Sequence, residues 1–234
     1  MLSASDRLHR TLLDSVSHEL KTPLSVLRSA TEKLGTLEPE KRARLVAEIG
    51  TATHRLDRLV AHLLNQTRLE SGALRPQPDW CDARDLIAAA RRAVDDALEG
   101  HSLTLEIPDD LPLFRADSPL MEQVLINLLL NAARHTTAGS QIRISAGRAS
   151  ARIFIAIADN GPGLPPEIAA NPFQKFRPGH NAGAGGLGLG LSIVRGFMQA
   201  QGGDVTAGRS AEGGACFTVH LPYHPHGDVP EDER

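Results

Sequence analysis

A heptad seam of apolar residues at positions 45–63 constrains the fold more than any other feature. The seam alternates steps of four and three residues and consists of Leu45, Ile49, Ala52, Leu56, Leu59 and Leu63. This periodicity is that of a helix packed along a partner helix. An earlier apolar stripe consists of Leu13, Leu20, Leu24, Leu27, Thr31 and Leu34. Because Gly35 and Pro39 suit a helix stop and a helix start, we predict a helical hairpin over residues from about 5 to 70, in a first domain at 1–72.

Two helices alone cannot bury two apolar stripes. We therefore expect the hairpins of two chains to associate as a dimeric four-helix bundle. A coiled-coil spacer without any chemistry would carry the same seam, so the apolar pattern by itself leaves both interpretations open.

A turn-rich segment at residues 71–78 ends the hairpin, and the periodicity beyond it is mixed. The pattern predicts helices at 85–98, 119–134 and 189–201, and strands at 103–107, 142–146, 153–158 and 216–221. This order predicts an α/β sandwich, a sheet with helices packed on one face, in a second domain at 79–223. Residues 224–234 are polar and are expected to form a disordered tail.

The composition excludes several classes of protein. A net charge of -3 gives no electrostatic footprint for nucleic acid or for an anionic membrane. Two cysteines are too few for a disulfide framework and suit a reducing compartment. No apolar run reaches the roughly 18 to 20 residues that span a bilayer, and no signal peptide leads the chain. We expect a cytoplasmic protein, or the cytoplasmic portion of a sensor whose membrane region is absent from this sequence.

The segment Ser-His-Glu-Leu-Lys-Thr-Pro at residues 17–23 places reactive groups on the first predicted helix. At about 100° per residue, His18 lies roughly 160° around the helix from Leu20, so its ring should face solvent. A surface histidine is usually only solvated. Here Glu19 can orient the ring or accept its proton, and Lys21 can attract phosphate. Pro23 removes a helical N–H donor, which should kink the helix one turn from His18.

Asn127 and Asn131 interrupt the apolar helix predicted at 119–134, and their spacing of four puts them on one face. A buried amide is unfavourable without partners, so these positions indicate a role. An amide oxygen is a hard ligand that suits Mg²⁺, which in turn bridges phosphate oxygens. Two asparagines bonded to backbone are the alternative. Arg134 lies one turn further on and can bind phosphate.

Two glycine clusters follow. Asp159 ends a predicted strand, where its carboxylate can accept the exocyclic amine of adenine, and Gly161 and Gly163 let backbone approach a ligand. The second cluster comprises Gly186, Leu187, Gly188, Leu189 and Gly190. It formally contains a dinucleotide-binding glycine pattern, but no strand is predicted directly before it. We interpret it as a lid that ends at a helix N-terminus, where free N–H groups meet phosphates. Lys175 is a candidate phosphate contact near the start of the lid.

In this order the motifs resemble the catalytic core of a bacterial sensor histidine kinase, over residues from about 8 to 222. The resemblance implies a HisKA dimerisation and phosphoacceptor hairpin, then an ATP-binding domain of the Bergerat (GHKL) fold. It implies Mg-ATP-dependent phosphorylation of His18 and transfer of the phosphoryl group to an aspartate in the receiver domain of a response regulator. A narrower similarity, to potassium-responsive KdpD-type kinases, rests on residues 78–87 and 111–127.

The same resemblance implies roles for individual residues. Asn131 becomes the magnesium ligand, and Asn127 and Arg134 become nucleotide or phosphate contacts. His135 stands where many relatives carry tyrosine, so its contact with the nucleotide is the least direct transfer. Phe173 and Phe176 match the family's phenylalanine motif at the lid base. Glu19 and Thr22 match the pair that holds the water which dephosphorylates the regulator.

Two rival functions fit part of the pattern. A chaperone- or topoisomerase-like ATPase shares the asparagine and glycine motifs but has no use for the His18 segment on a dimerising hairpin. A noncatalytic dimerisation module would not need Asn131, Asp159 and both glycine clusters, and a nucleotide-binding measurement separates it from a kinase.

Overall fold

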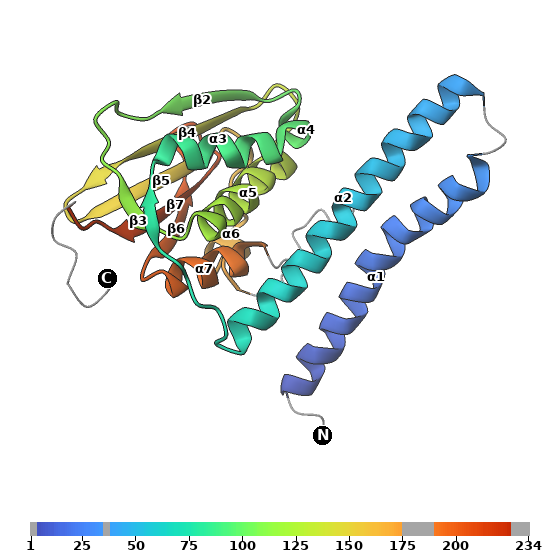
Figure 1. Ribbon diagram of the computed structural model, residues 1–234, viewed down its shortest axis with the longest axis horizontal. Coiled ribbons are helices and arrows are strands. Elements are labelled where there is room, and N and C mark those ends of the chain that lie inside the picture. Colours follow the sequence, from blue (N-terminus) through green and yellow to red (C-terminus); the bar gives the residue numbers. More distant parts are fainter. Residues whose placement is uncertain (1–3, 35–37, 175–189, 226–234) are drawn as a thin grey trace. The chain divides into compact units, whose positions relative to one another are not determined.

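The computed structural model describes residues 4–34, 38–174 and 190–225, and the chain divides into two compact units. The first unit is a helical hairpin of α1 (Ala4–Lys33) and α2 (Pro39–Glu70), drawn in blue and cyan in Figure 1. The second unit starts at Ser71 and combines a sheet with helices. Within the described ranges, no helix has the length and apolarity needed to cross a membrane.

The seam of α2 forms as predicted, with Ala52 and Leu59 buried and the other four members half-buried. The stripe of α1 differs from the prediction. Pro23 and Ala30 are buried in the hairpin, whereas Leu24 is 50% exposed and Thr31 is exposed, its hydroxyl donating to the Arg28 carbonyl. The side that faces α2 therefore follows positions 16, 20, 23, 27, 30 and 34, which also alternate steps of four and three.

The second unit is built on a five-stranded sheet in the order β2-β4-β5-β7-β6. The first pair, β2 with β4, is parallel and all other neighbours are antiparallel. The strands are β2 (Ser102–Glu106), β4 (Gln141–Ala149), β5 (Arg152–Asp159), β6 (Asp204–Arg209) and β7 (Ala215–Pro222). A separate two-stranded ladder pairs β1 (Asp79–Cys81) with β3 (Phe114–Ala116).

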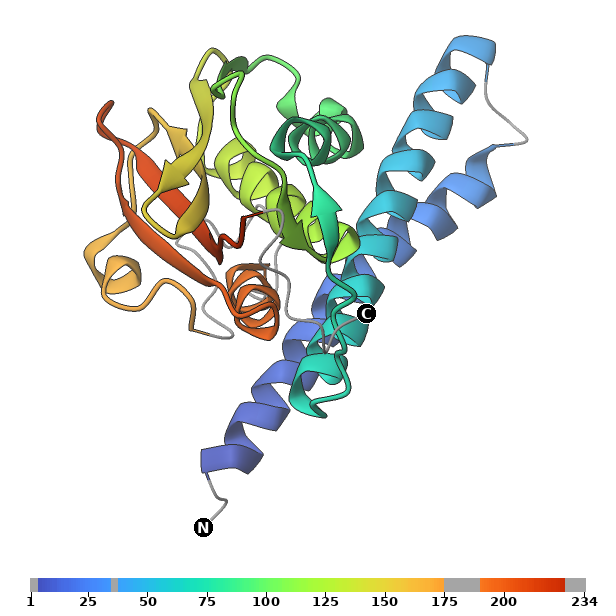
Figure 2. The same ribbon diagram turned by 60° about the vertical axis from the view of Figure 1, so that its left-hand side comes forward.

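Helices cover one face of the five-stranded sheet. They are α3 (Ala83–Ala93), α4 (Asp95–Leu98), α5 (Ser118–His135) and α7 (Gly190–Ala200), while the short α6 (Pro166–Ala169) follows β5 in the sequence. Figure 2 shows α3, α5 and α7 together on one side of the strands. Burial alternates along β7, where Phe217, Val219 and Leu221 are buried and the residues between them are half-buried. This alternation is that of a sheet with one covered face, so the predicted α/β sandwich is confirmed.

The sequence prediction missed four elements and merged two. The three-residue strands β1 and β3, the strand β6 and the short helix α6 were not predicted. The helix predicted at 85–98 is instead two helices, because Val94 leaves helical geometry at φ -128°. The other predicted elements are present with ends shifted by up to three residues, although residue 189, the predicted start of α7, lies outside the described part of the chain.

Candidate functional site

Asp159 is a buried carboxylate at the end of β5, with 6% of its surface exposed. Its Oδ1 accepts hydrogen bonds from the backbone N–H of Gly161 at 2.9 Å and of Ala215 at 3.0 Å. Within the described residues, Oδ2 accepts no hydrogen bond. The described residues thus hold the carboxylate by one of its two oxygens.

The main chain around Asp159 is held as firmly as its side chain. The Ser210 hydroxyl donates to the Asp159 carbonyl at 2.6 Å and accepts from the Gly214 N–H at 3.0 Å. A Cβ on Gly214 would overlap the Asp159 carbonyl oxygen and Oδ1. A glycine is therefore needed at 214 for the β6–β7 turn to close over the end of β5. Sequence reasoning missed Ser210 and Gly214, since both are more than fifty residues from Asp159.

Gly161 and Gly163 occupy positions where a side chain would not fit. A Cβ on Gly161 would lie 2.8 Å from Thr136 Cγ2 and 3.2 Å from the His135 carbonyl oxygen, so the end of α5 packs against this turn. Gly163 has φ +77°, which favours glycine, and a Cβ there would lie 3.3 Å from the Gly213 carbonyl oxygen. The first glycine cluster is thereby packed against α5 on one side and the β6–β7 turn on the other.

The two asparagines lie on α5, as predicted. Its N-cap is Asp117, whose side chain accepts from the Leu120 N–H, and a proline follows in the first turn. Asn127 is 7% exposed, and its amide nitrogen donates to the Gln123 carbonyl at 2.8 Å. The amide of Asn131 is half-buried and makes no hydrogen bond within the described residues. The backbone-bonded alternative therefore fits Asn127 in part and does not fit Asn131.

Gly190, the first residue of α7, lies against Asn127. A Cβ on Gly190 would be 3.1 Å from Asn127 Oδ1. The remainder of the predicted lid, Gly186, Leu187, Gly188 and Leu189, lies outside the described residues, as do Lys175 and Phe176. Phe173 stacks edge-on against the buried Phe217, with 6.4 Å between ring centres, so it anchors the segment before the lid to the core.

Arg134 and His135 are exposed at the C-terminal end of α5. Partial desolvation of the ring, and then the positive charge of Arg134, lower the pKa of His135, while Asp159 opposes this effect. Because the residue as a whole is exposed, water screens these charges. A neutral ring at this place can stack on or donate to a bound group without adding charge.

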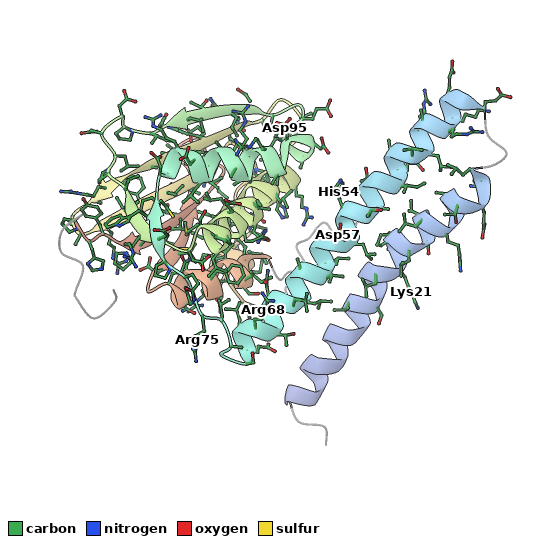
Figure 3. The ribbon with its side chains drawn as sticks, in the orientation of Figure 1. Lys21, His54, Asp57, Arg68, Arg75 and Asp95 are labelled. Atoms are coloured by element: carbon green, nitrogen blue, oxygen red, sulfur yellow. The ribbon has the colours of Figure 1, made fainter. Side chains whose placement is uncertain are left out.

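On the hairpin, His18 and Glu19 lie within α1, and their side chains are outside the described part of the structure. Thr22 and Lys21 are exposed on the same helix. Figure 3 shows Lys21 projecting from α1 on the side away from α2. Pro23 lies inside α1 and is buried. The His18 segment thus belongs to a continuous helix, with its described polar residues in contact with water.

Comparison with known proteins matches both units. Residues 8–72 match the family model described as the His Kinase A (phospho-acceptor) domain. Residues 116–225 match that of the Histidine kinase-, DNA gyrase B-, and HSP90-like ATPase. The sensor protein KdpD of Escherichia coli is 37% identical over 227 residues, which are 95% of this chain and 25% of KdpD. This chain belongs to the sensor histidine kinase family. The second match alone would also admit the gyrase- and HSP90-like rival, and the first match excludes it.

Solved structures of this family share the fold. The Acinetobacter baumannii histidine kinase AdeS superposes with a TM-score of 0.67 at 25% identity, covering 88% of this chain and 98% of AdeS. Full-length ShkA, solved in complex with AMPPNP, superposes with a TM-score of 0.66 at 25% identity, covering 92% of this chain and 46% of ShkA. The chain spans about a quarter of the length of the KdpD relatives that it matches.

Proposed function

We propose that this chain is a kinase core that transfers the γ-phosphoryl group of ATP to His18 and then to an aspartate of a response regulator. In the first step a bond forms between a ring nitrogen of His18 and the γ-phosphorus. The bond to the bridging oxygen breaks, ADP leaves, and Glu19 orients the ring or takes its proton. The observation that carries the proposal is the match of two consecutive parts of one chain, a phosphoacceptor domain containing His18 and an ATPase domain containing Asp159.

ATP binding is supported by the ATPase match and by the geometry of Asp159. We assign Oδ2, which accepts no bond within the described residues, to the exocyclic amine of adenine. Guanine carries a carbonyl oxygen at the equivalent position, which a carboxylate would repel, so the site selects adenine. Gly161 and Gly163 line the turn beside this carboxylate, and Arg134 and His135 belong to the end of α5 that packs against this turn.

The residues on α5 fit a magnesium ion held together with substrate phosphates. The described residues contain no cluster of three or more histidine, cysteine or acidic groups that could hold a metal alone. Mg²⁺ commonly takes one or two protein oxygens and completes its shell with waters and phosphates. We assign Asn131 as that protein ligand and Asn127 as a neighbouring nucleotide contact. When bound, the ion would neutralise charge on the phosphates, and Lys175, Gly186, Leu187, Gly188, Leu189 and Gly190 would cover them.

The hairpin supports dimerisation. Besides the seam between its two helices it exposes a second apolar set: Leu24 at 50%, Val46 at 54%, Val60 at 46% and Leu64 at 55%. Such side chains are expected to be buried by another hairpin, giving a four-helix bundle of two chains. We place the kinase core in the cytoplasm, where ATP and response regulators are found, with domain boundaries at 1–72 and 79–223 and a tail at 224–234.

The central experiment incubates the purified chain with Mg²⁺ and γ-labelled ATP and tests the stability of the label in acid and base. Phosphohistidine is labile in acid and stable in base, and the label should map to His18. His18→Gln should abolish labelling and retain ATP binding. Asn131→Asp should lose both labelling and magnesium-dependent binding. A label on other side chains, or full activity of either variant, would overturn the proposal.

We also propose that the core dephosphorylates its regulator, with Glu19 and Thr22 holding the attacking water. Thr22 is exposed on α1, within one turn of His18, as this role requires. Thr22→Ala should suppress dephosphorylation of the phosphorylated receiver domain more than autophosphorylation. Equal loss of both activities would count against this role.

A further inference from the structure

Asp117 joins three segments that are distant in the sequence. Its Oδ1 accepts from the Leu120 N–H at 3.0 Å and caps α5, and its Oδ2 accepts from the Gln77 N–H at 2.7 Å. Its own backbone N–H donates to Gln201 Oε1 at 2.8 Å. The residue is 7% exposed, so these bonds are shielded from competing water.

Gln201 directly follows α7, and both ends of its amide are used. Oε1 accepts from Asp117, and Nε2 donates to the Phe197 carbonyl one turn back, at 3.2 Å. Two backbone bonds, from Gly202 to Gln199 and from Gly203 to Met198, close the helix there, and Gly202 has φ +73°. The C-terminal end of α7 is thereby attached to the N-terminal end of α5.

The opposite end of α7 meets the nucleotide site. Gly190 begins the helix and packs against Asn127 of α5. The end of α7 contacts Asp117, at the start of α5, so the two helices run antiparallel between these two points of contact. Between the two points α7 buries several apolar side chains, with Ile193, Val194 and Phe197 fully buried. Apolar packing is non-directional, whereas a hydrogen bond at the far end specifies how far α7 extends along α5.

We propose that Gln201 is a positioning residue for the nucleotide site. Its bond to Asp117 holds α7 at the register that brings Gly190 onto Asn127. This inference rests on the proposed function, because it assumes that Asn127 contacts ATP. Gln201 touches no substrate and acts through α7.

The carboxylate of Asp117 also holds the segment that follows the hairpin in the sequence. Pro76 and Pro78 have no N–H, so Gln77 supplies the only backbone donor among these three residues. That donor forms a short bond to a buried carboxylate, a strong class of hydrogen bond. Asp117 thus holds α5, α7 and the connecting segment at one point.

The test compares Gln201→Met with Gln199→Met in the full chain. Methionine matches glutamine in length and removes the amide, and Gln199 is exposed on the same helix, so it controls for the change in composition. Without its attachment α7 samples other registers, and ATP must select the competent one. We expect the KM for ATP in His18 phosphorylation to rise about tenfold in Gln201→Met, with the maximal rate changed less than about threefold. Gln199→Met should match the unmodified chain.

A second measurement needs no nucleotide. Amide hydrogen exchange of residues 191–200 should be about tenfold faster in Gln201→Met than in Gln199→Met. Equal exchange in the two variants overturns the inference, whether or not the chain binds ATP. An unchanged KM overturns it as well, and so does a rise in KM that is matched by an equal fall in the maximal rate. Failure of the proposed function has a different signature, because the unmodified chain would then bind no ATP.

Discussion

At the scale of single residues, the site that we assign to adenine depends on the absence of a Cβ at Gly214. Substitution by alanine would place a Cβ against the carbonyl oxygen and Oδ1 of Asp159, both of which are already hydrogen-bonded. Neither the backbone of β5 nor the buried carboxylate can move aside cheaply. We expect Gly214→Ala to lower the free energy of unfolding by about 3 kcal/mol or more and to abolish ATP binding.

Gly208→Ala is the control for this change. Gly208 lies in β6, the strand before the β6–β7 turn, with open space where its Cβ would stand. Its alanine variant should unfold within about 1 kcal/mol of the unmodified protein, as urea titration can measure. Equal stability of the two variants would show that the β6–β7 turn does not need to close on Asp159.

His135 gives a prediction about pH. Since its pKa is lowered in the folded chain, the unfolded chain binds the proton more readily. The stability that depends on a neutral His135 is therefore present above about pH 6.5 and is lost as the pH falls below it. Between pH 7.5 and 5.5 the urea midpoint should fall further in the unmodified protein than in His135→Gln. Equal falls would contradict the lowered pKa.

Residue patterns revealed some of the site and concealed the rest. Asp159, Asn127 and Asn131 stand out locally, because polar residues interrupt apolar runs or end a strand. Ser210 and Gly214 read as ordinary turn residues, and their function depends on pairing β5 with β7 across the chain. The hydrogen bonds that Asp117 makes with Gln77 and Gln201 are concealed as well, because they join residues distant in the sequence.

At the scale of elements, long periodic segments were predictable and short ones were not. The helices α1, α2, α5 and α7 bury a continuous face, which a periodicity of 3.6 reveals. The strands β1 and β3 have three residues each, too few to show alternation. Within α1 the apolar stripe was misplaced by one position at two points, since Pro23 and Ala30 fill the seam while Leu24 and Thr31 do not. The leucines of α1 predict its apolar side, and the buried Pro23 and Ala30 show where that side contacts α2.

The exposed apolar set of the hairpin makes a prediction about assembly. Leu64→Lys would place a charge among side chains that we expect a second hairpin to cover. The dimer dissociation constant should rise at least tenfold, as measured by sedimentation, while helix content is retained. Thr51→Lys, at an exposed position on the opposite side of α2, is the control and should leave the dimer intact. A Leu64→Lys variant that sediments like the control would rule out this surface.

At the scale of the whole molecule, the two units divide the chemistry. The hairpin carries the phosphoacceptor segment, and the second unit carries the residues that we assign to ATP. Each unit has its own packing, so damage to one should spare the other. A fragment beginning at Ser71 should bind ATP but should not itself become phosphorylated, because it lacks His18. It should slowly phosphorylate His18 of a separately added hairpin.

The sheet gives a prediction about truncation. A chain ended after Gly214 lacks β7, which pairs with both β5 and β6 and supplies the Ala215 N–H to Asp159. We expect it to lose the cooperative unfolding transition of the second unit, with the hairpin still helical by circular dichroism. A chain ended after Pro225 keeps β7 and should melt within about 2 °C of the unmodified protein. A sharp transition in the shorter chain would contradict this account of the sheet.

Among the described strands, β7 is the last in the sequence and lies in the interior of the sheet, between β5 and β6. While the polypeptide is still emerging from the ribosome, both neighbours of that strand have unpaired edges, which invite association with other nascent chains. The site that we assign to adenine cannot be complete until translation has passed residue 222, the end of β7. An unfinished chain would therefore carry His18 before it could bind the ATP that we propose phosphorylates this residue.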